Sequence, residues 1–283
     1  MPLLPILRII HPQGRPLGPL TMYQPLPEHG LDQLDPFLLL HHHGPQTFPP
    51  HNAGLPFGPH PHRGFETVTF IYEGDVQHRD SNGYESTIRG GGVQWMTAGS
   101  GLVHSETSSA EFRREGGPVE LIQLWINLPA RLKMTPPDYR GLRKEDIPVA
   151  EAGGTSVAIA SGTWTGVNGP VSAPGGTALA TLTLSPGAAY SREIPAGKSI
   201  LFYVLNGDVT VNGTNVRGRA LVVFGEDGGL VELASETGCR VLWGIAEPLR
   251  EPVVAHGPFV MNTTDEIRQA VADYQNGKMG FLA

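Results

Sequence analysis

The stretch Gly58-Pro59-His60-Pro61-His62-Arg63-Gly64-Phe65-Glu66-Thr67-Val68-Thr69 places two histidines two positions apart, directly before a run of aromatic and β-branched residues. Such residues favour β-strands, and in a pleated strand residues i and i+2 project to the same side. Their Cα atoms lie roughly 7 Å apart, so the imidazoles of His60 and His62 can converge on one ion. The alternative is that both histidines flank Pro61 in a loop and never converge.

A second pair follows in Leu102-Val103-His104-Ser105-Glu106, where a carboxylate takes the place of the second imidazole. The two pairs together offer three imidazoles and one carboxylate. Nitrogen and oxygen ligands without a thiolate suit iron, manganese, copper, nickel, cobalt or zinc better than a closed structural zinc site. We therefore predict one metal site made of His60, His62, His104 and Glu106.

The same strand phase makes predictions for the neighbours of the first pair. If His60 and His62 face inward, so do Gly64 and Glu66. Gly64 would then leave volume beside the ion for a substrate or water, and Glu66 would either orient an imidazole or form an ordinary ion pair. In the apolar stretch Val119–Leu128, the polar residue Gln123 shares a face with Trp125, and it either lines a cavity or packs in the core.

A run of three histidines, His41-His42-His43, follows the apolar residues Phe37–Leu40. Successive residues of a strand face opposite sides, so the three imidazoles cannot all reach one ion. We expect the run to mark the end of a buried strand at the rim of a pocket.

The composition indicates a β-rich protein of one large domain or two ordinary ones. Among 283 residues there are 37 glycines and 26 prolines, which favours many turns and short strands. The formal charge of −7 argues against a surface that binds nucleic acid phosphates. A single cysteine, Cys239, excludes an intrachain disulfide, and no apolar run approaches the roughly 20 residues needed to span a bilayer. We expect a cytoplasmic protein, or a nuclear one in a eukaryote.

An internal repeat divides the chain. Phe202–Val209 echoes Phe70–Val76, and counting from the shared Gly-Asp-Val places Glu193 at the position of His60. Ten of the eleven histidines lie in the first 104 residues. The second half therefore reads as the same barrel without a metal. We predict a metal-binding domain at 1–135, a linker at 136–148, and a metal-free domain at 149–283 that ends in a helix, capped by Thr263 and Glu266.

Several motifs together resemble the pirin family of the cupin superfamily: HPHRGFETV at 60–68, QWMTAG at 94–99, HSE at 104–106 and QLW at 123–125. EPLREP at 247–252 and HGPFVMN at 256–262 are similar to the pirin C-terminal signature. The segment from Glu66 to Gly74 is one residue longer than the general cupin pattern, as is typical of pirins. The run His41–His43 departs from the family and has no assigned role.

The resemblance implies an all-β bicupin, two β-barrel (jelly-roll) domains in tandem with a C-terminal helix. It implies one Fe(II) per chain, held by His60, His62, His104 and Glu106. In an oxygenase reaction Glu106 would either stay a ligand or swing off the metal to accept the substrate hydroxyl proton as the base. Some bacterial pirins cleave quercetin with O2, and mammalian pirin is a nuclear coregulator of transcription. The expected function is therefore dioxygenase cleavage of a flavonol. The alternative is an iron-dependent redox sensor that binds a protein partner. We expect a monomer.

Overall fold

The computed structural model describes residues 1–282. Most of these residues lie in strands, and few lie in helices. Contacts divide the chain into two compact units. The unit formed by residues 14–24, 37–146 and 249–283 is called here the first barrel, and the unit formed by residues 1–13, 25–36 and 147–248 the second barrel. The all-β bicupin architecture predicted from the sequence is confirmed.

Two antiparallel sheets build the first barrel. The seven-stranded sheet has the order β12 (Asp138–Leu142), β9 (Val93–Thr97), β6 (Phe65–Glu73), β11 (Gly117–Asn127), β4 (Phe37–Phe48), β3 (Leu20–Leu26) and β2 (Gly14–Leu17). The four-stranded sheet has the order β5 (Phe57–His62), β10 (Leu102–Thr107), β7 (Asp75–Asp80) and β8 (Glu85–Arg89). A short hairpin joins β24 (Val254–His256) to β25 (Phe259–Met261).

A larger sheet builds the second barrel. Its main order is β1 (Ile6–Ile10), β21 (Ala220–Phe224), β19 (Ser199–Val211), β23 (Cys239–Ala246), β17 (Ala178–Leu184), β14 (Thr155–Ser161) and β13 (Val149–Ala152). Three further strands pair off this path, namely β18 (Ala188–Ile194), β20 (Thr214–Arg217) and β22 (Gly229–Ser235). A two-stranded hairpin consists of β15 (Thr163–Trp164) and β16 (Val167–Asn168).

Aromatic side chains fill the interior of the second barrel. Phe202 and Trp164 pack edge-on against Trp243 with ring centroids 5.1 and 5.8 Å away, and all three rings are fully buried. Glu193, which counting places at the position of His60, is exposed on β18, and its cross-strand partner is Leu230. The buried interior around these three rings is thus apolar, whereas Glu193 is exposed.

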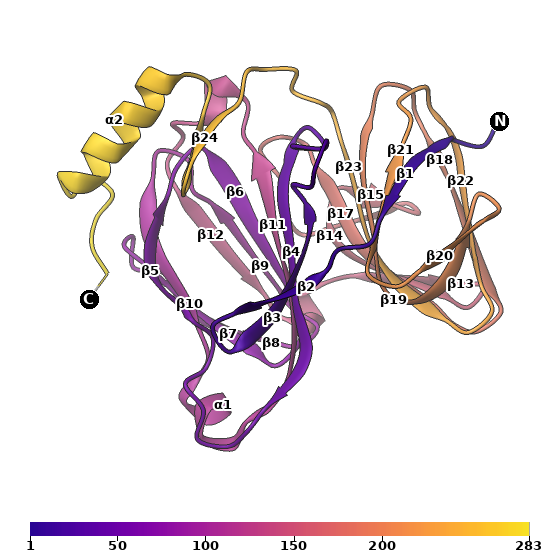
Figure 1. Ribbon diagram of the computed structural model, residues 1–283, viewed down its shortest axis with the longest axis horizontal. Coiled ribbons are helices and arrows are strands. Elements are labelled where there is room, and N and C mark those ends of the chain that lie inside the picture. Colours follow the sequence, from indigo (N-terminus) through magenta and orange to yellow (C-terminus); the bar gives the residue numbers. More distant parts are fainter. Residues whose placement is uncertain (283) are drawn as a thin grey trace. The chain divides into compact units, whose positions relative to one another are not determined.

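The boundaries between the two units differ from those predicted. The segment 136–148 is no simple linker, because β12 extends the first barrel's sheet by pairing with β9. β1, drawn in indigo among the orange strands of Figure 1, belongs to the second barrel through its pairing with β21. The C-terminal residues 249–283 belong to the first barrel. Hydrophobic periodicity identifies strands but does not say which sheet they join, so these exchanges leave no mark in the sequence.

Helices are few. The predicted C-terminal helix is α2 (Thr264–Gln275), and its capping box of Thr263 and Glu266 is formed in both directions. A second, unpredicted helix, α1 (Ala110–Glu115), begins after Ser109, whose hydroxyl accepts a hydrogen bond from the Phe112 amide. Single 3-10 turns occupy Ala130–Leu132 and Lys144–Asp146. Within residues 1–282, no helix is both long enough and apolar enough to cross a membrane.

Candidate metal centre

Three histidines of two neighbouring strands converge inside the first barrel. β5 and β10 run antiparallel, with His60 directly opposite His104 and His62 opposite Leu102. The ring of His104 lies 4.4 Å from that of His60 and 4.9 Å from that of His62, centroid to centroid, and the two β5 rings lie 4.8 Å apart. One potential ligand nitrogen from each ring lies within 4.8 Å of the other two. In the described part of the chain, this is the one group of three or more His, Cys, Asp or Glu residues whose ligand atoms lie close enough together to hold a metal ion.

The hydrogen bonds of the three rings leave nitrogen lone pairs free. His60 Nδ1 donates to the Gly58 carbonyl at 2.7 Å, and His62 Nδ1 donates to the Pro258 carbonyl at 3.3 Å. Nε2 of His62 and both ring nitrogens of His104 are buried without a hydrogen-bond partner. Burying an unpaired polar atom costs about 1–3 kcal/mol, so a cluster of such nitrogens fits a site that binds a metal ion.

The charge state of the rings also fits. Burial, together with the neighbouring His60, lowers the pKa of His62 to about 3. Burial and the two β5 rings hold the pKa of His104 well below its ordinary value. Both imidazoles are therefore neutral at pH 7, as a metal ligand must be. The donor set suits a divalent transition metal.

Glu106 lies on the same face of β10 as His104, because it is two residues further on. Its carboxylate is buried, and its oxygens accept hydrogen bonds from the Thr69 hydroxyl at 2.8 Å and the Gln123 amide at 2.6 Å. It is not a member of the close group formed by the three imidazoles. Each carboxylate oxygen has two lone pairs, so these bonds leave Glu106 capacity to bind a cation.

Gly64 and Glu66 do not have the predicted roles. Gly64 has a φ of +90°, and a Cβ there would stand 2.0 Å from the Val260 carbonyl oxygen, so the glycine makes room for the C-terminal segment rather than for a substrate. The positive φ of Gly64 makes a kink between β5 and β6. Beyond this kink, the residues that were expected to face the histidines face the opposite side of the sheet. Glu66 consequently points away from Thr69 and Glu106, and accepts hydrogen bonds from Trp95 and Thr97. Burial raises the pKa of this carboxyl to about 7.

A further histidine that sequence reasoning missed lies beside the three. His78 is the cross-strand neighbour of Glu106, and its ring lies 5.5 Å from that of His104. Nε2 of His78 is 3.0 Å from the buried Asp80 carboxylate, and Tyr139 stacks on the ring at 3.9 Å. His78 and Asp80 form another i, i+2 pair on a strand, so the spacing rule that identifies the candidate ligands would have identified this pair as well.

The triple histidine lies in the middle of β4 and not at a strand end, which corrects the prediction. His42 faces one side of the sheet and contacts Glu120 at 3.1 Å, and both are buried. His41 and His43 face the other side, with ring centroids 5.9 Å apart. His43 Nδ1 is buried without a hydrogen-bond partner, and burial lowers the pKa of that ring to about 3. None of the three belongs to the close histidine group.

One face of the seven-stranded sheet is partly open beside the cluster. Leu39 pairs with Trp125, and His41 pairs with Gln123, across β4 and β11. These four side chains are half-buried, although most of their neighbours on both strands are fully buried. The Trp125 ring lies 5.2 Å from that of His62. From the sequence, Gln123 was expected either to line a cavity or to pack in the core. In the structure it is half-buried on this partly accessible surface and donates a hydrogen bond to Glu106.

Two cupin barrels in tandem, one with converging histidines, define a bicupin with a candidate metal centre in its first barrel. Residues 20–126 match the Pirin family, and residues 179–280 match the Pirin C-terminal cupin domain. Human Pirin is 39% identical over 259 residues, covering 89% of this chain and 85% of that protein. Pirin-1 of Arabidopsis thaliana is 40% identical over 255 residues, covering 88% and 84%. The chain belongs to the pirin family.

A solved structure agrees over the whole length. The crystal structure of quercetin 2,3-dioxygenase from Acinetobacter baumannii matches with a TM-score of 0.93 at 35% identity, and the match covers 100% of both chains.

Proposed function

We propose that this protein is a metal-dependent dioxygenase that cleaves a flavonol such as quercetin, with His60, His62, His104 and Glu106 as the metal ligands. The observation that carries the proposal is the His104 imidazole, 1% exposed with neither nitrogen hydrogen-bonded, among two other histidines and beside a carboxylate. The similarity to a quercetin 2,3-dioxygenase over 100% of the chain supports the substrate class.

An Fe(II) ion bound here would supply redox-active coordination of dioxygen and substrate oxygen together. The same donor set accepts manganese, cobalt, nickel, copper or zinc. The protein's own contribution begins with position. The β5–β10 pairing fixes three imidazoles, and the backbone carbonyls of Gly58 and Pro258 hold the protons of His60 and His62 on Nδ1. That tautomer presents Nε2 of both rings to the ion.

Glu106 is the candidate base. A flavonol must lose the proton of its reactive hydroxyl, and Glu106 is the carboxylate beside the three imidazoles on the same strand face. Thr69 and Gln123 each donate a hydrogen bond to one oxygen of this carboxylate, which fixes its position. Either oxygen can accept the substrate proton through a remaining lone pair.

The half-buried side chains of β4 and β11 form a surface that suits a flat, hydroxylated aromatic molecule. Trp125 and Leu39 offer an apolar surface, on which an aromatic ring can pack. Next to them, His41 and Gln123 offer polar atoms to hydroxyl groups. His60 is the most exposed of the three candidate ligands and lies on β5 at the edge of its sheet, so we infer that small molecules enter there.

Oxygen consumption with quercetin, measured on Fe(II)-loaded protein prepared without air, tests the proposal. Glu106→Gln keeps the size and one oxygen donor but loses the charge and the basic oxygen. We expect this variant to bind Fe(II) only modestly more weakly, and to turn over on the order of 10²-fold more slowly, as for removal of a positioned base. If fully loaded wild-type protein consumed no oxygen with any of several flavonols, the dioxygenase assignment would fail, and the redox sensor would be the better account.

A further inference from the structure

The C-terminal segment of the first barrel packs against both strands that carry the candidate ligands. α2 lies beside the β5 side of that barrel in Figure 1. Val103, which precedes His104, shares a buried cluster with residues of the segment, namely Phe259, Met261, Ile267, Ala270 and Met279. The hydroxyl of Ser81 donates to the Met279 carbonyl at 2.7 Å and accepts from the Val103 amide at 3.1 Å. The chain end is thereby bound one residue away from His104.

Further contacts form directly after β5, the strand that carries His60 and His62. The Arg63 amide donates to the Pro258 carbonyl at 3.4 Å, and the Val260 amide donates to the Arg63 carbonyl at 3.0 Å. The buried Lys133 ammonium donates to the carbonyls of Gly64 and Val260 at 2.8 and 3.0 Å. Arg63, which directly follows His62, is thus paired with the C-terminal segment along its backbone, and Lys133 bridges Gly64 to the same segment.

The Pro258 carbonyl also reaches the ligand ring itself. It accepts the Nδ1 proton of His62 at 3.3 Å. A metal-bound imidazole commonly donates its other N–H to such an acceptor, which fixes its tautomer and ring orientation. The position of Pro258 therefore bears directly on how His62 presents Nε2.

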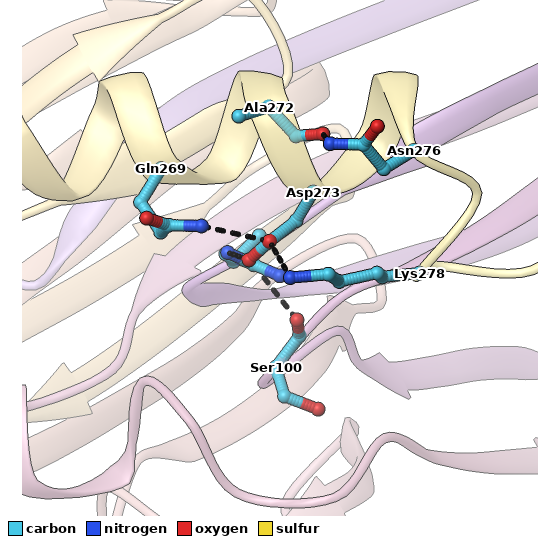
Figure 2. A network of polar contacts seen from close by, with 7 residues as sticks. Ser100, Gln269, Ala272, Asp273, Asn276 and Lys278 are labelled. Carbon is cyan, nitrogen blue, oxygen red and sulfur yellow. Dashed lines mark hydrogen bonds and ion pairs between the residues drawn. The ribbon is translucent and has the colours of Figure 1, made fainter.

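One buried carboxylate on α2 anchors this arrangement. Asp273 accepts hydrogen bonds from Arg63 Nη1 at 2.9 Å, and from Lys278 Nζ and Gln269 Nε2 at 2.8 Å each, as Figure 2 shows for the two partners on the C-terminal segment. Arg63 Nε donates in turn to the Ser100 carbonyl at 2.7 Å. Arg63 is 4% exposed and Asp273 7% exposed, so breaking their pair leaves a buried charge without compensation.

We propose that Asp273 is a positioning residue of the metal centre, because by holding Arg63 it fixes the backbone pairing with Pro258 that orients the His62 imidazole. Metal binding and docking of α2 then stabilise each other, and by linkage each strengthens the other by the same factor. The inference rests on the metal ligands proposed above, but it does not depend on which reaction the centre catalyses.

Cobalt(II) titration of the whole protein tests it, since the visible spectrum of cobalt reports its ligands. Asp273→Asn keeps the shape of the side chain and removes the charge. Loss of a residue that supports a metal ligand typically lowers affinity 10–100-fold, and for one acting through Arg63 we expect about 10-fold together with a changed cobalt spectrum. The matched control is Asp265→Asn on the same helix, whose ion pair with Arg268 is exposed, and there we expect less than about a 2-fold change.

A second variant and a second measurement separate positioning from general loss of stability. Lys278→Met removes a largely exposed partner of Asp273 but leaves Arg63 in place, so cobalt affinity should stay within about 2-fold of wild type. In wild-type protein, cobalt should slow hydrogen exchange of the α2 amides about 10-fold more than that of the α1 amides. Equal cobalt affinity in Asp273→Asn and Asp265→Asn, or equal slowing of exchange in α1 and α2, would overturn the proposal.

Discussion

His62→Ala should remove the metal from this protein while leaving its apo fold nearly intact. His62 is one of three converging imidazoles, and its Nε2 is buried without a partner. Structural zinc sites with four ligands bind with about 10–16 kcal/mol, so one ligand accounts for about 2.5–4 kcal/mol. That free energy corresponds to a metal Kd about 10²–10³-fold weaker.

The apo stability should respond much less. Replacing the 2%-exposed His62 ring by a methyl group loses packing and the bond to the Pro258 carbonyl. The same change also removes a buried nitrogen without a partner, and the two effects have opposite signs. We expect the free energy of unfolding of the apoprotein to change by about 1 kcal/mol, which is a shift in Tm of about 2–4 °C.

His42→Ala is the matched control, because His42 is equally buried on the same barrel but faces the other side of its sheet. The variant loses the contact with the Glu120 carboxylate, which should cost about 1–3 kcal/mol. Its Tm should fall while its metal affinity stays within about 2-fold of wild type. The assay is metal titration in parallel with thermal unfolding of metal-free protein. Equal metal loss in both variants would refute the reasoning and assign the histidine run to the site.

Two further predictions follow from the same geometry. Elemental analysis of the full chain should find one metal equivalent, because the second barrel has an aromatic interior; a second equivalent that persists in His104→Ala would contradict this. His43 has a pKa of about 3 in the folded protein and about 6.5 when unfolded, so only the unfolded chain takes up its proton, and stability is lost as the pH falls from about 6.5 toward 3. His43→Leu should therefore lose less Tm between pH 7 and pH 4 than wild type, and an equal loss in both proteins would show that His43 does not titrate in this way.

The strand phase of the pairs His60/His62 and His104/Glu106 could be predicted from the sequence because it is a local property. His60, His62 and His104 converge because i, i+2 spacing and antiparallel pairing act over a few residues. The predicted phase failed past Gly64, where a positive φ reverses the facing of the strand, so Glu66 points away from Glu106. A glycine in a strand permits such a kink without revealing its direction.

Contacts between distant segments could not be predicted. Nothing near His62 indicates that Pro258, almost 200 residues away, supplies the acceptor for its ring. Likewise, the exchange of β1 and α2 between the units depends on tertiary pairing, and a periodic apolar pattern is the same whichever sheet receives it. Thr69 and Gln123 donate hydrogen bonds to Glu106, but the sequence indicates only that both residues lie on strands.

Anomalous diffraction from a crystal of the iron-loaded protein tests the central claim most directly. We expect a single strong iron peak per chain, in the first barrel, bonded to His60, His62, His104 and Glu106. An iron peak bonded to other side chains, such as the pair His41 and His43, or equal peaks in both barrels, would contradict the account. A peak held by the three imidazoles with Glu106 still bonded only to Thr69 and Gln123 would remove the carboxylate from the ligand set.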